Sequence, residues 1–163
     1  MASLSMPIMP THFAFSCMMT PYRPDGAAFQ IFVSDASDVD WARQSAREMA
    51  TREGLTEKRA VALATAVSEI ARNIVAHAIK GQIALQPVTD GERRGIFVVA
   101  RDQGPGIADI ACAMQDGYST KHTLGSGLPG AKRLVDAFEI ESVVGVGVTV
   151  TMLQWDEDDL TDL

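Results

Sequence analysis

The chain has 163 residues, of which 47% are hydrophobic and 21% are charged, and these values are typical of a soluble protein with one hydrophobic core. Its net charge is −7, but five of its acidic residues follow Trp155, so the rest of the chain is close to neutral. This balance argues against a surface that binds nucleic acid through a strong positive field, and no apolar run is long enough to span a membrane.

The two cysteines, Cys17 and Cys112, are too few for a disulfide framework or a zinc site, and they favour a reducing, cytoplasmic setting. We expect residues 1–27 to form a flexible extension. Prolines interrupt its methionine-rich run, and no positive charge precedes Arg23, so it does not match a signal peptide. Residues 154–163 are predicted to be a solvated acidic tail, which leaves one domain over residues 28–153.

The first half of this domain is predicted to contain a strand and two helices. AFQIFV (28–33) is rich in strand-forming residues. A helix over 38–52 follows, with Ser37 and Asp40 spaced like a capping pair. Thr56 is then placed to cap a longer helix that ends near Ile79, because apolar residues recur within it every three or four positions.

The second half is predicted to contain two β-hairpins separated by a long polar stretch. The first hairpin comprises residues 81–87 and 95–101, and the second comprises 138–144 and 147–153. Between them lie an irregular stretch with a short helix near 107–114 and a helix over 128–137. Because the strands come as hairpins, the expected fold is an α/β (α+β) sandwich with a mixed, mostly antiparallel sheet and helices on one face.

Gly125-Ser-Gly127-Leu-Pro-Gly130 has the spacing of the dinucleotide fingerprint, G-x-G-x-x-G. That fingerprint should follow a buried strand, whereas this one follows a polar stretch, so a Rossmann site is not expected. The P-loop pattern fails as well, because Ala131 stands where a lysine is needed. What remains is a glycine-rich helix start, at which backbone N–H groups can approach phosphate oxygens.

A second pattern lies on the long helix. Glu69 and Asn73 are four residues apart and so share one side of the helix, with His77 one turn further on. An amide oxygen suits Mg²⁺, and a carboxylate can orient or deprotonate a hydroxyl. Alone, the pair would be typical of a solvated helix face, and His77 would be typical of a surface or packing residue.

The blocks SEIARN, DQGPGI, DGYSTKHT, GSGLPG and GVTVTM, in this order and at this spacing, resemble the conserved boxes of the GHKL (Bergerat) ATP-binding fold. Gyrase, histidine kinases and MutL share this fold. The short chain and the run from AMQDGYST to LVDAFEI are similar to its serine/threonine-kinase branch, which includes the stressosome switch kinases and the related anti-sigma factor kinases.

The resemblance implies a role for particular residues. Asp102, after the strand GIFVVAR, would bind the adenine amino group, with Thr149 joining it and with Gly104 and Gly106 leaving room for base and sugar. Asn73 would ligate Mg²⁺ and Glu69 would act as the general base. The resemblance also implies phosphate contacts for Gly125, Gly127, Leu128 and Lys121, although a solvated Lys121 is equally expected from its polar surroundings.

These implications favour an ATP- and Mg²⁺-dependent protein serine/threonine kinase. Its expected substrate is a STAS-domain scaffold or antagonist protein in a stress-response partner switch, and a PP2C-type phosphatase is an expected further partner. The alternative is an anti-sigma factor that sequesters a sigma factor under nucleotide control. A nucleotide-binding domain without turnover is a third reading of the same motifs.

Overall fold

The computed structural model describes residues 22–115 and 127–156. The described elements, in chain order, are β1 (Arg23–Pro24), β2 (Phe29–Val33), α1 (Ala36–Arg52), α2 (Glu57–Asn73), the π-helical turn η2 (Ile74–Ala78), β3 (Gly81–Thr89), β4 (Arg94–Asp102), α3 (Ile110–Ala113), α4 (Gly127–Leu134), β5 (Ala137–Val143) and β6 (Gly147–Trp155).

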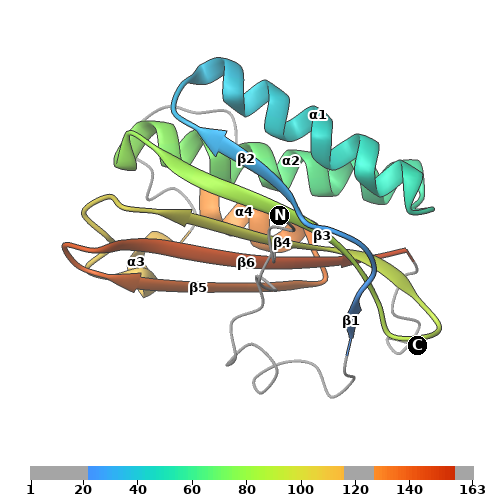
Figure 1. The fold of residues 1–163 in the computed structure, drawn as a ribbon. Coiled ribbons are helices and arrows are strands. Elements are labelled where there is room, and N and C mark those ends of the chain that lie inside the picture. Colours follow the sequence, from blue (N-terminus) through green and yellow to red (C-terminus); the bar gives the residue numbers. More distant parts are fainter. Residues whose placement is uncertain (1–21, 116–126, 157–163) are drawn as a thin grey trace, which may run out of the picture.

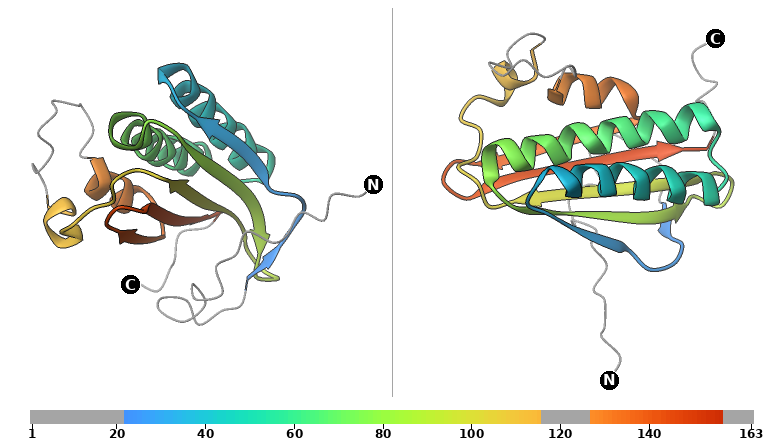
Figure 2. Two further views of the ribbon diagram at one scale, coloured as in Figure 1. Left: turned by 60° about the vertical axis from the view of Figure 1, so that its left-hand side comes forward. Right: turned by 90° about the horizontal axis from the view of Figure 1, so that it is seen from above.

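The described strands form one antiparallel sheet in the order β1-β3-β4-β6-β5, with β2 also paired to β3. Helices α1, α2 and α4 cover one face of this sheet (Figures 1 and 2). The predicted fold class, an α/β sandwich with helices on one face of a mixed, mostly antiparallel sheet, is confirmed, except that every pair of described strands is antiparallel.

The core lies between the helices and the sheet. Along β4, Ile96, Val98 and Ala100 belong to this core, whereas Phe97 and Val99 point to the opposite face, as the two-residue period of a strand requires. The apolar stripe of α2 meets these strand residues. Full burial of an isoleucine or valine side chain such as Ile96 or Val98 stabilises the fold by about 1.5–3 kcal/mol.

Helix α1 begins earlier than predicted, and its cap is a different residue pair. The Asp35 side chain accepts the N–H groups of Ser37 and Asp38, and the Asp38 side chain accepts the N–H of Asp35 in return. The predicted Ser37–Asp40 pair is wrong, because Asp35 has the extended backbone that a capping residue needs and Ser37 is already helical.

The long helix starts after Thr56, whose hydroxyl accepts the N–H of Arg59, as predicted. It remains α-helical only to Asn73 and continues as the wider turn η2. The turn ends at Ile79, a residue with a positive φ of 72°. This change of helix type lies beside the candidate site described below.

Helix α4 ends three residues before the predicted boundary. The N–H of Asp136 donates to the carbonyl of Leu153, and Ala137 pairs with Leu153, so these residues belong to the sheet. Strand β6 also runs two residues further than predicted, to Trp155. None of the helices within the described part of the chain is long and apolar enough to cross a bilayer.

Candidate active site

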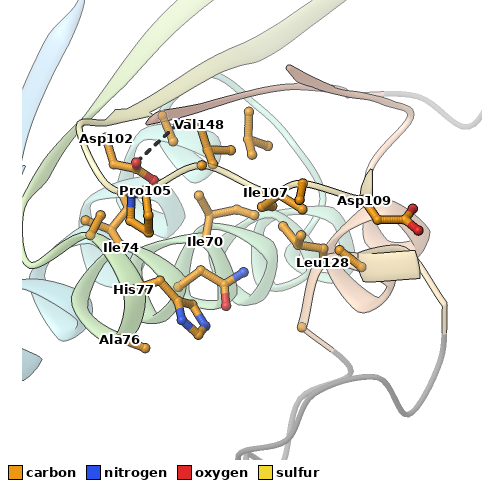
Figure 3. Close-up of a pocket in the computed structure, with 18 of the residues that line it drawn as sticks. Ile70, Ile74, Ala76, His77, Asp102, Pro105, Ile107, Asp109, Leu128 and Val148 are labelled. Atoms are coloured by element: carbon orange, nitrogen blue, oxygen red, sulfur yellow. Dashed lines mark hydrogen bonds between the residues drawn. The ribbon is translucent and has the colours of Figure 1, made fainter. Parts of the chain in front are cut away.

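A cavity of about 560 Å³ opens between α2 with η2, the loop after β4, the start of α4 and strand β6. This volume is within the range of small-molecule sites in proteins. Figure 3 shows side chains from all these segments around it. Three segments that are far apart in the sequence therefore meet at one site: the helix with Asn73, the strand end with Asp102 and the glycine-rich helix start at Gly127.

Asp102 occupies one end of the cavity, where β4 ends. Its Oδ1 accepts the N–H of Gly104 at 2.9 Å and the N–H of Val148 at 3.2 Å, the second of which is drawn in Figure 3. Both bonds fall on the same oxygen and fix the plane of the carboxylate. Within the described ranges no group donates to the other oxygen, Oδ2, so this oxygen can accept a hydrogen bond from a ligand.

The walls beside Asp102 are apolar. They are formed by Ile70, Ile74, Ile107, Leu128, Val148 and Val150. Branched apolar side chains from α2, η2, α4, β6 and the loop after β4 suit a largely apolar group such as a purine base. A carboxylate at the end of the cavity selects a ligand with a hydrogen-bond donor, such as an exocyclic amino group.

Asn73 and His77 also line the cavity, and they come from the last turn of α2 and from η2. The structure thus brings the predicted Asn73 to the site. The structure also places His77 in the lining, whereas the sequence alone predicts a surface or packing residue at this position. The signal for His77 was its position one turn beyond Asn73, but this spacing alone does not separate a site residue from a solvated one.

The first residues of α4 form another part of the wall. Gly127, Leu128 and Pro129 line the cavity, and they open an eight-residue helix. Free backbone N–H groups at a helix start favour an anion such as phosphate. No lysine or arginine is among the described residues that line the cavity, so within the described part of the chain the start of α4 is the group best suited to an anion.

The structure shows why positions 104 and 106 require glycine. The reason is close contact with other parts of the protein, whereas the predicted reason was room for the base and the sugar. A Cβ on Gly104 would lie 2.8 Å from the Cβ of Ala78, and a Cβ on Gly106 would lie 2.6 Å from the carbonyl oxygen of Val143. Gly106 also has a positive φ of 75° and lines the cavity. Both glycines therefore allow the loop to approach other parts of the protein, and only Gly106 borders the ligand space.

Thr149 is not brought to the cavity. The described lining contains its neighbours Val148 and Val150, and these alternate with Thr149 along β6. Thr149 pairs with Arg101 and Glu141 in the sheet and points to the face away from the helices. The predicted contact between Thr149 and a base beside Asp102 is corrected accordingly: the strand supplies the N–H of Val148 instead.

Glu69 is buried and does not line the cavity. Its carboxylate bonds to the guanidinium of Arg72 at 2.7 Å, and about half of the Arg72 side chain is exposed. Glu69 lies one turn before Asn73, on the side of α2 next to the cavity. The predicted Lys121 and Gly125 lie outside the described residues.

These groups fit a magnesium-bound adenine nucleotide. Asp102 and the apolar walls suit the base, and the start of α4 suits phosphate. No group of three or more His, Cys, Asp or Glu side chains within the described ranges could hold a metal ion. A single amide ligand, Asn73, fits Mg²⁺, which commonly takes one or two protein ligands and completes its shell with substrate phosphates and water.

Comparisons with known proteins agree with this architecture. A sequence model of the histidine kinase-like ATPase domain matches residues 32–154. The serine/threonine-protein kinase RsbT of Bacillus subtilis is 45% identical over 118 residues, which cover 72% of this chain and 89% of that protein.

Anti-sigma F factors are more distant relatives. Those of Thermoanaerobacter sp. and Caldanaerobacter subterraneus are 29% and 28% identical over 130 and 131 residues, which cover 76% of this chain and 90% of each relative. The predicted resemblance to GHKL-fold serine/threonine kinases and anti-sigma factors is therefore confirmed. Fold, cavity and similarity over three quarters of the sequence lead to one conclusion: the chain belongs to the family of histidine kinase-like ATPase domains.

Proposed function

We propose that this protein is an ATP- and Mg²⁺-dependent serine/threonine kinase that phosphorylates a STAS-domain scaffold or antagonist protein in a stress-response partner switch. The observation that supports it most is the convergence of Asp102, Asn73 and the start of α4 on one cavity, in a chain 45% identical to a serine/threonine-protein kinase.

In this proposal each part of the cavity has one task. Asp102 accepts a hydrogen bond from the adenine amino group through the oxygen that the backbone leaves unoccupied. Asn73 supplies an oxygen to the metal, which neutralises phosphate charge when bound. The N–H groups at Gly127 and Leu128 orient the phosphates. Phosphoryl transfer depends mainly on such positioning and charge neutralisation.

Glu69 is the proposed general base. It would accept the proton of the substrate hydroxyl as that oxygen bonds to the γ-phosphorus and the bond to ADP breaks. Because Glu69 now binds Arg72, this role requires the carboxylate to exchange the guanidinium for the hydroxyl. Arg72 is half exposed, so its own charge returns to water when it turns away, and the substrate hydroxyl then becomes the hydrogen-bond partner of the buried Glu69 carboxylate.

The first test is Asn73→Ala, assayed with labelled ATP, Mg²⁺ and purified STAS-domain proteins. Loss of the metal ligand is expected to slow phosphoryl transfer by at least about 100-fold, the scale on which lost charge stabilisation acts. Gln115→Ala is the matched control, because Gln115 also lines the cavity and the change removes a side-chain amide to which no role is assigned. Equal loss in both variants would contradict a specific role for Asn73.

The second test separates the base from the binding site. Glu69→Gln should bind ATP as the parent does but transfer phosphate about 10²–10⁴ times more slowly, which is the usual contribution of a general base. Arg72→Gln removes the partner of Glu69 and should keep most of the activity. If Glu69→Gln transfers phosphate at the rate of the parent, Glu69 is not the base.

The alternative function is that of an anti-sigma factor, and the similarity to the anti-sigma F factors favours it as second candidate. Under the leading proposal, the kinase released from its STAS-domain partner would bind a PP2C-type phosphatase. The parent protein should therefore label a STAS-domain protein and leave transcription by alternative sigma factors unchanged. Inhibition of transcription without labelling of any STAS-domain protein would establish the alternative instead.

A further inference from the structure

The ion pair between Glu69 and Arg72 joins a buried group to an exposed one. Nη1 of Arg72 donates to Oε1 of Glu69 at 2.7 Å. The Arg72 side chain is 48% exposed and the Glu69 side chain is 7% exposed. Within the described ranges no other group donates a hydrogen bond to the Glu69 carboxylate, and the hydroxyl of the adjacent Ser68 donates to the carbonyl of Thr65 instead. An arginine in contact with solvent therefore fixes the position of this buried carboxylate.

The pair holds Glu69 away from the nucleotide space. Among the described residues, Asn73 lines the cavity, whereas Glu69, one turn earlier on the same side of α2, does not. The lining is partly open to solvent, because His77, Asp109 and Gln115 belong to it and are exposed. Water can therefore enter the cavity while the carboxylate of Glu69 is held outside it.

Water competes with a protein hydroxyl at such a site. A carboxylate that accepts the proton of a serine or threonine can accept one from water as well. In that reaction the water oxygen would bond to the γ-phosphorus, the bond from this phosphorus to the bridging oxygen of ADP would break, and the proton would pass to Glu69. ATP would then be hydrolysed to ADP and phosphate without phosphorylation of a protein.

We propose that Arg72 is a specificity-determining residue that suppresses this hydrolysis. While Arg72 holds Glu69, the carboxylate is withheld from a water molecule beside the γ-phosphate. Transfer proceeds when a docked protein substrate displaces Arg72 and its hydroxyl takes the place of the guanidinium at Glu69. The inference rests on the proposed role of Glu69 as general base, and it adds a function for the partner of that base.

The two acceptors differ in the binding energy that they bring to the site. A protein substrate makes contacts far from its hydroxyl, and their binding energy can be used to rearrange groups at the reacting centre. Water makes no such contacts, so it does not compensate for the loss of the ion pair. The exposure of Arg72 suits this exchange, because the freed guanidinium returns to solvent.

The test is the rate of phosphate release from ATP and Mg²⁺ by the full-length chain with no protein substrate present. Arg72→Met removes every donor but keeps a straight side chain that suits a helix. We expect this variant to hydrolyse ATP about 10-fold faster than the parent, a modest part of what a free general base contributes. A faster rate cannot arise from partial unfolding. Phosphoryl transfer to a STAS-domain protein that the parent labels should stay close to the parent rate.

Two further variants serve as controls. Arg43→Met removes an arginine that also pairs with an acid three residues away on its helix, Asp40, but that lies outside the described lining. Its hydrolysis rate should equal that of the parent. Arg72→Lys keeps a cation with hydrogen-bond donors for Glu69, so it should keep hydrolysis slow.

The double variant Glu69→Gln, Arg72→Met shows whether the effect passes through Glu69, and it should hydrolyse ATP no faster than Glu69→Gln alone. The inference is overturned if Arg72→Met leaves hydrolysis at the parent rate, if Arg43→Met accelerates it equally, or if the double variant is also accelerated. Failure of the proposed function has a different signature, because Glu69→Gln would then transfer phosphate to the STAS-domain protein at the parent rate.

Discussion

At the scale of single residues, Asp102 divides its carboxylate between protein and ligand. Oδ1 holds two backbone N–H groups, so Asp102→Asn can keep those bonds through its amide oxygen while placing an NH₂ donor against the adenine amino group. We expect ATP to bind about 10- to 100-fold more weakly, as a hydrogen bond to a charged group is worth about 1.5–3 kcal/mol. Calorimetric titration measures the affinity.

Asp109→Asn is the matched control for that change. Asp109 also lines the cavity, but its carboxylate caps α3 by accepting the N–H of Cys112, and asparagine caps a helix equally well. ATP affinity should stay within about twofold of the parent, since no direct base contact is assigned to Asp109. If ATP binds similarly weakly to both variants, its affinity depends on the total negative charge of the cavity and not on a specific contact with Asp102.

Ile79 is the second residue at which one side chain decides a measurable quantity. It is a β-branched residue with φ of 72° and ψ of −46°, and it is 80% exposed, so its strain is not offset by packing. Relief of backbone strain of about 1–3 kcal/mol exceeds the entropic cost of glycine, about 0.5–1 kcal/mol. We therefore expect Ile79→Gly to raise the free energy of unfolding by about 1 kcal/mol.

Urea unfolding of Ile79→Gly and Ile79→Ala measures this effect. Alanine keeps a Cβ and therefore keeps most of the strain, so it should give little or no gain. A glycine variant no more stable than the alanine variant would mean that the turn after η2 carries no strain.

At the scale of elements, the cap of α1 gives a pH-dependent prediction. Hydrogen bonds from the Ser37 side chain and from the backbone lower the pKa of Asp35 below its ordinary value of 3.8. A lowered folded-state pKa means that the cap stabilises the protein above the unfolded pKa and loses this effect as the pH falls through the folded one. Asp35→Ala should therefore be less stable than the parent at pH 7, and the difference should shrink in acid.

Asp35→Asn distinguishes the cap from general charge effects. Asparagine keeps an acceptor oxygen without a proton to lose, so the Asp35→Asn chain should remain capped at acidic pH. Thermal unfolding followed at a series of pH values gives the comparison. If the difference in unfolding temperature between the parent and Asp35→Ala stays constant down to the lowest pH, ionised Asp35 does not stabilise the cap.

The sequence predicts which helices and strands exist better than it predicts where they end and to which side a given residue points. The period of α2, the two hairpins and the sheet class are confirmed, because hydrophobic pattern determines them. The predicted contact between Thr149 and the base is wrong for a specific reason. A shift of one residue along a strand moves a side chain to the other face of the sheet. The motif alone does not determine whether Val148 or Thr149 faces the helices. The end of α4 failed because tertiary hydrogen bonds to Leu153 decide it.

At the scale of the whole molecule, the sequence order of the boxes predicted which segments converge, and the cavity contains Asn73, Asp102, Gly106, Gly127 and Leu128. These segments meet because the apolar sides of the helices and of the sheet pack against each other in one core. The place of His77 at the site could not be predicted, because a helix turn of unusual width leaves no periodic signal in the sequence.

The most direct test of the central claim is a crystal structure with Mg²⁺ and a non-hydrolysable ATP analogue. We predict the adenine amino group at about 3 Å from Oδ2 of Asp102, and the side-chain oxygen of Asn73 at about 2.1 Å from the metal. We also predict phosphate oxygens at the N–H groups that open α4. A nucleotide bound outside this cavity, or bound within it with Asp102 and Asn73 both facing away from it, would contradict the account.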